Sequence, residues 1–270
     1  MIKSFLPILL LTSLIAQNSY SFSFNNTVGA AFNTDQVIVN VADNCSNLGI
    51  TNEDLLTIIQ EALDEYWNTV ATSKLVLVLG SLITLDNAFY TEKMCTKSGN
   101  NCEPNINLIV SSGITISCNE NSTDNFTSDS ILGITLPNNI TGSVLQGSLL
   151  LINDRVTNQF QNKSRSQMIS IIAHELGHAI GLGHSPIKDS LMYYTLVPVR
   201  DRLGFDDIDG VTYLYPKSQP FGCGLIHYVN TKNDEDQNSI ILLALVFFLS
   251  LLIISLYRKE KPLLVHSSSY

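Results

Sequence analysis

The sequence predicts an α+β domain that is followed by a single membrane-spanning helix. Short apolar stretches in the first two thirds of the chain have the length and alternation of strands, and two longer segments carry helix-capping patterns. The predicted order is one strand, one helix, four strands and a second helix. Residues 239–257 form an almost uninterrupted apolar run that is long enough to cross a bilayer.

The first strand and the first helix follow from simple periodicity. Residues 36–41 alternate between polar and apolar side chains, which predicts a strand. Thr51 is expected to cap the helix that follows, with Asp54 three residues later as an acidic partner in a capping box. Apolar residues then recur on one stripe as far as Trp67, which we interpret as a core residue.

The remaining elements come from short apolar runs and from turn-forming residues. Four more strands are predicted, at residues 74–80, 105–111, 131–136 and 148–152. Residues 113–130 are rich in Asn, Ser, Thr and Asp, which predicts a loop, and residues 137–139 predict a turn. Ser164 and Gln167 form the capping box of the second helix.

Both ends of the chain have the composition of targeting segments. A basic start, a short apolar core and a polar flank predict a secretory signal peptide over residues 1–21. The apolar run at 239–257 has acidic residues before it and basic residues after it, so the positive-inside rule places residues 258–270 in the cytoplasm. A domain over residues 22–217 is then expected outside the cytoplasm, joined to the span by a connector over 218–238.

Charge and cysteine content narrow the functional classes. The formal net charge is −9 and the large central section has no Lys/Arg cluster, which excludes nucleic acid as a main partner. All five cysteines precede the predicted span, where disulfides persist. Cys95 and Cys102 flank a turn-like segment and predict a local bridge. The pairing among Cys45, Cys118 and Cys223 stays open, and one thiol is left over.

The strongest signal is an H-E-x-x-H-x-x-G-x-x-H pattern over residues 174–184. Residues four apart share one face of a helix, so His174 and His178 can bind the same metal ion. Glu175 lies beside them, where its carboxylate can accept a proton from water. Gly181 is suited to ending the helix and reversing the chain, which would return His184 as a third ligand. Three imidazoles and an open fourth position are typical of catalytic zinc.

Residues after this pattern carry a family resemblance. Ser185, the Leu-Met-Tyr segment at 191–193 and residues 205–211 together resemble the metzincin metalloproteases, and in particular the matrixins. The resemblance implies a zincin-like catalytic domain with a twisted, mostly parallel five-stranded sheet, an antiparallel edge strand and three helices. It further implies that Met192 forms an apolar floor beneath the metal. Residues 131–136 would then be the edge strand that binds extended substrate.

The sequence departs from the matrixin pattern in two places, so not every property of the family is expected here. The second, structural zinc of matrixins needs histidines before the catalytic helix, and this sequence has none there, so we expect one zinc ion. The family's propeptide with its inhibitory cysteine also has no recognisable counterpart before the first strand. Calcium is a further candidate cofactor, because the loop over 119–129 and Asp154 offer oxygen donors.

The sequence therefore predicts a zinc metalloendopeptidase, with Glu175 as the catalytic base and His174, His178 and His184 as metal ligands. Its expected substrates are proteins or peptides, including surface or matrix proteins. The expected location is the cell surface or a secretory-pathway membrane, with the catalytic domain extracytoplasmic. The alternative is a membrane-tethered zinc-binding adhesion or interaction module without proteolytic activity.

Overall fold

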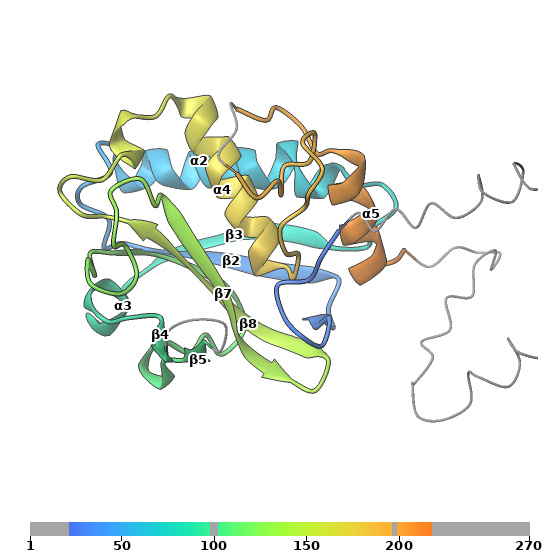
Figure 1. Cartoon of the computed structure of the whole chain (residues 1–270), viewed down its shortest axis with the longest axis horizontal. Coiled ribbons are helices and arrows are strands. Elements are labelled where there is room, and N and C mark those ends of the chain that lie inside the picture. Colours follow the sequence, from blue (N-terminus) through green and yellow to red (C-terminus); the bar gives the residue numbers. More distant parts are fainter. Residues whose placement is uncertain (1–21, 98–101, 196–198, 218–270) are drawn as a thin grey trace, which may run out of the picture. The chain divides into compact units, whose positions relative to one another are not determined.

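A six-stranded sheet forms the framework of the domain (Figure 1). The structure is a computed structural model that describes residues 22–97, 102–195 and 199–217. The strand order is β1-β8-β6-β2-β3, with β7 paired to the other edge of β8. The strands are β1 Ala31–Phe32, β2 Gln36–Ala42, β3 Val76–Ile83, β6 Gly113–Asn119, β7 Gly133–Thr141 and β8 Val144–Asn153.

Only β7 runs antiparallel to its neighbour in this sheet; the other pairs are parallel. The prediction of a mostly parallel sheet with an antiparallel edge strand is therefore confirmed. The two-residue strand β1, which pairs with the start of β8, was not predicted.

Two capped helices lie on one side of the sheet (Figure 1). Helix α2, Asn52–Glu65, begins after Thr51 with both hydrogen bonds of the predicted capping box. Helix α4, Arg165–Ala179, begins after Ser164 in the same way. On the other side of the sheet lie the one-turn helix α3, Ala88–Thr91, and a hairpin of β4, Cys95–Lys97, and β5, Glu103–Pro104. The last described helix is α5, Phe205–Leu214.

The main core fills the space between the sheet and helices α2 and α4. Trp67 is 1% exposed there, which confirms its interpretation as a core residue. A smaller cluster on the opposite face contains Met94, Leu108, Val110, Phe126, Leu149 and Leu151. Strand β8 contributes to both cores, which explains why residues 149–152 are continuously apolar instead of alternating.

The predicted strand at 105–111 is wrong. These residues contain a 3₁₀ helix, Ile106–Leu108, whose N-cap is Asn105. The Asn105 side chain accepts a hydrogen bond from the Asn107 N–H at 3.1 Å, so local capping outweighs the β-propensity of the apolar residues. Ile106 is exposed and does not belong to a buried strand face.

The predicted loop at 113–130 is also wrong in its first part, because this part is the buried strand β6. Its polar residues are satisfied by long-range hydrogen bonds. Asn44 donates to the Ser117 hydroxyl at 3.0 Å, and the Asn119 amide donates to the carbonyls of Phe89 and Glu92 at 2.9 and 3.0 Å. Polar composition therefore does not exclude a central strand when partners fold against it.

Strand β7 is longer than predicted and passes through the expected turn at 137–139. Register shifts beginning at Pro137 and Asn139 let the strand continue to Thr141. The chain turns instead at Gly142, which has a φ of +63°.

Two disulfides join the described cysteines. Cys95 pairs with Cys102, as predicted, and Cys45 pairs with Cys118, which resolves a pairing that the sequence left open. The bridge from Cys45 to Cys118 links the segment after β2 to β6. Cys223 lies outside the described residues.

Several predicted segments lie outside the described residues as well: the signal peptide 1–21, the connector 218–238, the span 239–257 and the tail 258–270. Among the helices that the structure does describe, none combines the length and the apolar character that crossing a bilayer requires.

Two of the groups proposed for calcium, the Asp154 carboxylate and the Asn119 side-chain oxygen, are occupied by hydrogen bonds. Asp154 is fully buried, and its carboxylate accepts from the N–H of Ser46 at 3.1 Å, the N–H of Asn47 at 2.8 Å and the hydroxyl of Tyr90 at 3.0 Å. The side-chain oxygen of Asn119 likewise accepts from Asn121 N and Asn125 Nδ2. These oxygens do not fit a calcium ion, because N–H and O–H groups already point at them.

We predict that Asp154→Asn destabilises the domain by about 2–4 kcal/mol. The substitution replaces one carboxylate oxygen with an NH₂ group, which cannot accept the hydrogen bonds from the buried N–H and O–H groups that face it. Urea unfolding followed by fluorescence measures this change. The exposed Asp124→Asn is the matched control and should change stability by less than about 0.5 kcal/mol. Equal stabilities for the two variants would contradict the role given to Asp154.

Candidate active site

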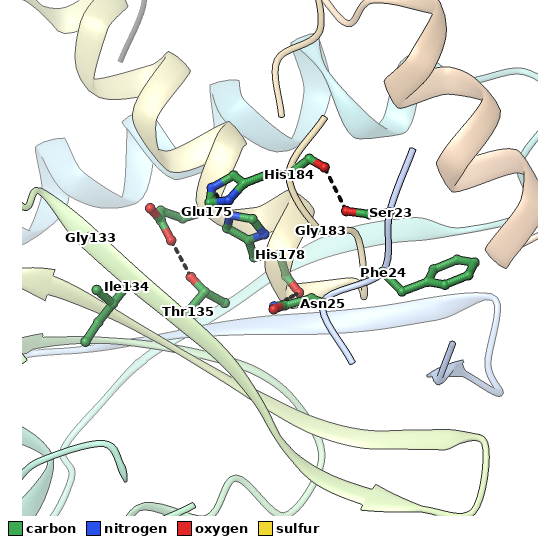
Figure 2. Close-up of a pocket in the computed structure, with 10 residues that line it drawn as sticks. All are labelled: Ser23, Phe24, Asn25, Gly133, Ile134, Thr135, Glu175, His178, Gly183 and His184. Carbon is green, nitrogen blue, oxygen red and sulfur yellow. Dashed lines mark hydrogen bonds between the residues drawn. The ribbon is translucent and has the colours of Figure 1, made fainter. Parts of the chain in front are cut away.

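Helix α4 and the turn that follows it bring the three histidines together, and Figure 2 shows two of them, His178 and His184. His174 and His178 lie one turn apart on α4, which ends at Ala179. Gly181 then adopts a φ of +108°, and a Cβ at this position would lie 2.8 Å from the carbonyl oxygen of Ala30. A glycine is therefore required for the reversal that returns His184 to the helix.

The three imidazoles have the geometry of a metal site. One ring nitrogen from each histidine lies within 4.8 Å of the others, and the Nε2 atoms of His178 and His184 are 3.2 Å apart. Nδ1 of His174 donates to the Leu191 carbonyl at 2.7 Å, and Nδ1 of His178 donates to the Leu182 carbonyl at 2.8 Å. These bonds fix the ring planes and leave both Nε2 atoms available to a metal ion, as metal-ligating histidines require.

The surroundings of His178 and His184 favour the neutral imidazoles that a metal ion needs. Burial lowers the pKa of His178 to about 3, and the neighbouring His174 and His184 act in the same direction. Burial and His174 also lower the pKa of His184. Three nitrogen donors with room for one more ligand fit a catalytic zinc ion.

Met192 packs against Gly177, in the helix turn between the two α4 histidines. A Cβ on Gly177 would come within 2.3 Å of the Met192 sulfur and 2.7 Å of Trp67 Cζ2, so only glycine allows this packing. Met192 is 2% exposed. The indole of Trp67 also donates to the Ala173 carbonyl at 2.8 Å, a contact that sequence reasoning missed.

Asp207 holds the segment that contains Met192. This buried carboxylate accepts hydrogen bonds from the N–H groups of Leu191 at 2.6 Å, Met192 at 3.1 Å and Gly204 at 2.7 Å. Because the Leu191 carbonyl orients His174, Asp207 supports a metal ligand through one intervening residue. Asp206 and Asp207 form an acidic first turn of α5, which is the one feature of the sequence that points to this role.

Glu175 points from α4 toward strand β7 (Figure 2). The Thr135 hydroxyl donates to Glu175 Oε2 at 2.7 Å. Burial raises the pKa of Glu175, whereas the nearby His174 and the hydrogen bond from Thr135 oppose this rise. Neither Thr135 nor its neighbour Gly133 was identified from the sequence.

The site opens into a cleft with a volume of about 520 Å³. Residues 133–135 of β7 form one wall and residues 23–25 form the other, with Glu175, His178 and His184 between them (Figure 2). The N-terminal wall is attached to the metal-ligand turn, because Gly183 N–H donates to the Ser23 carbonyl at 2.7 Å. Sequence reasoning also missed this wall.

Comparison with known proteins decides the family. The family model for matrixins matches residues 50–216, which is more than half of the chain and includes the whole histidine motif. The chain belongs to the matrixin family.

Several curated relatives match this matrixin over short segments. Metalloendoproteinase 2-MMP of Arabidopsis thaliana is 35% identical over 69 residues, which cover 25% of this chain and 18% of the relative. Metalloendoproteinase 4-MMP of the same plant is 46% identical over 54 residues, covering 19% and 16%. Interstitial collagenase of Oryctolagus cuniculus is 41% identical over 68 residues, covering 25% and 14%. The match thus spans less than a fifth of each of these relatives.

We predict that Asp207→Asn weakens zinc binding by about 10- to 100-fold, because the segment that orients His174 loses its anchor. Competition with a fluorescent zinc chelator measures the affinity. Asp209→Asn, an exposed substitution two residues along the same helix, is the control and should bind zinc like the unmodified protein. A normal affinity in Asp207→Asn would show that the hydrogen bonds to Leu191 do not support the site.

Proposed function

We propose that this matrixin is a zinc-dependent endopeptidase that cleaves extended protein segments outside the cytoplasm. One observation carries the proposal. The carboxylate of Glu175 and the imidazoles of His178 and His184 line a single open cleft next to strand β7, and His174 completes the group of three ring nitrogens. A protein that bound zinc only for stability would need the histidines but not an acidic side chain held beside them.

His174, His178 and His184 would hold the zinc ion, which supplies Lewis-acid polarisation of the scissile carbonyl and acidifies water when bound. Glu175 lies where it can take a proton from the attacking water. The water oxygen forms a bond to the carbonyl carbon, the bond from that carbon to nitrogen breaks, and Glu175 returns the proton to the leaving amine. The products are a carboxylate and a free amine.

The substrate would bind in an extended conformation along β7. Among the described residues this strand pairs only with β8, so its second edge is available to another strand. Three consecutive residues of β7 line the cleft beside Glu175. A peptide that added to this edge would place its backbone carbonyls close to the base, which favours protein substrates over small amides.

The expected location follows from the ends of the sequence. A signal peptide at 1–21 and a span at 239–257 would leave the domain outside the cytoplasm, close to the membrane. The connector over 218–238 is short and polar. Surface proteins and matrix proteins near the same membrane are then the substrates within reach.

We predict that Glu175→Gln abolishes most peptide cleavage, with a loss of at least about 100-fold in kcat, because the amide cannot accept the proton. Hydrolysis of a quenched fluorescent peptide library measures turnover, and metal analysis should show that the variant still binds one zinc ion. The unmodified chain should lose activity with 1,10-phenanthroline and regain it with added zinc.

The same assay separates the enzyme from the alternative adhesion or interaction module. Such a module would bind zinc without cleaving any library member, and Glu175→Gln would leave its properties unchanged. Cleavage by the Glu175→Gln variant at the normal rate would instead show that another group is the base.

We predict that the full chain, expressed in a secretory cell, stays in the membrane pellet after alkaline carbonate extraction, because residues 239–257 would span the bilayer. A variant lacking 239–257 should be secreted into the medium. Recovery of the full chain from the medium would contradict membrane anchoring but would leave the catalytic proposal intact.

A further inference from the structure

We infer that Thr135 and Gly133 of the edge strand β7 are positioning residues for Glu175, so that the strand expected to bind the substrate also orients the base. This inference rests on the proposed endopeptidase function. It concerns a contact between β7 and α4 that the motif over residues 174–184 does not contain.

The hydrogen bond from Thr135 fixes one carboxylate oxygen. The hydroxyl lies 2.7 Å from Glu175 Oε2, and both side chains are partly buried. Within the described part of the chain, each side chain has this single hydrogen bond. Because Oε2 is held by a donor, Oε1 is the oxygen that remains free to accept a proton. A charged acceptor also makes this bond stronger than one between neutral groups.

Gly133 provides the space in which the carboxylate lies. Residues two apart in a strand project from the same face, so positions 133 and 135 both face Glu175. A Cβ at position 133 would lie 2.9 Å from Glu175 Cγ, 3.2 Å from Cδ and 3.3 Å from Oε1. Gly133 does not have a positive φ, so the strand geometry itself accepts alanine and the steric limit comes from Glu175.

Together the two residues define the position of the carboxylate from both sides. Thr135 attracts Oε2, and the missing side chain at Gly133 leaves room for Cγ, Cδ and Oε1 (Figure 2). Without the hydroxyl, the Glu175 side chain could rotate about its terminal torsion, which is broad for glutamate. The base would then be present but misdirected, and small errors of this kind cost large factors in rate.

The first test uses an isosteric change in the full chain. Thr135→Val keeps the shape of the side chain but removes the donor, and should lower kcat by about 10- to 100-fold with KM unchanged within about twofold. Thr135→Ser restores a hydroxyl and should recover most of the lost kcat. Thr57→Val, an exposed substitution on helix α2, is the matched control and should behave like the unmodified protein.

The second test distinguishes orientation of the base from direct contact with substrate. Binding of an uncleaved peptide to Glu175→Gln, measured by fluorescence anisotropy, should not change when Thr135→Val is added. The residual turnover of Glu175→Gln should also be insensitive to this second substitution, because a residue that acts through Glu175 has no further effect once the base is removed. Zinc content should be the same in all variants.

Gly133→Ala provides an independent variant, because it displaces the carboxylate without touching the donor. It should lower kcat by a factor similar to Thr135→Val, with normal peptide affinity and a melting temperature within a few degrees of the unmodified protein. Normal kcat in Thr135→Val, or a loss that appears only in KM and peptide affinity, would overturn the inference. An unmodified chain that cleaves no peptide would instead reject the proposed function itself, and with it this role for β7.

Discussion

The reversal of the chain at Gly181 is the constraint on which the metal site depends. Helix α4 can present two histidines without help, but the third ligand must return to the same point within five residues of the helix end. The positive φ of Gly181 and its contact with the Ala30 carbonyl leave no room for a side chain. The same turn places the Leu182 carbonyl where it accepts a hydrogen bond from Nδ1 of His178. The backbone conformation at Gly181 therefore brings His184 back to the helix and also orients the ring of His178.

On the face of the sheet opposite helices α2 and α4, the loops are stabilised by the buried amide of Asn119 and the buried carboxylate of Asp154. The NH₂ group of Asn119 donates to two backbone carbonyls, and its side-chain oxygen accepts from two N–H groups. An apolar residue could make none of these hydrogen bonds, and an aspartate could only accept. The Asp154 carboxylate accepts hydrogen bonds from two separate segments of the chain, residues 46–47 and Tyr90. Such bonds hold irregular loops in one conformation where little apolar surface is available, and removing a partner would leave buried donors unsatisfied. The disulfide between Cys45 and Cys118 ties the same region to β6.

The elements that could be predicted from the sequence are those whose causes are local. The capping boxes at Thr51 and Ser164 lie within four residues, and both helices begin where these patterns place them. Strand β6 could not be predicted in this way, because Ser117 and Asn119 are acceptable in a buried strand only through partners up to 73 residues away. The hydrogen bond between Thr135 and Glu175 joins residues 40 apart in the sequence, so it too could not be predicted from local patterns. The motif therefore predicted the metal ligands and the base, whereas Thr135, which orients the base, could be identified only from the folded structure.

The regular part of β7 coincides with the part that faces the site. Residues 133–136 pair one-to-one with residues 149–152 of β8, and the register shifts begin only after Pro137. Because β8 is buried on both faces, the pairing fixes these residues more firmly than a surface loop would. A substrate strand added to the outer edge of β7 would take its register from the same backbone that carries Thr135 and Gly133. The distance from the base to the scissile carbonyl would then be set by one rigid strand, which reduces the reorganisation needed for proton transfer.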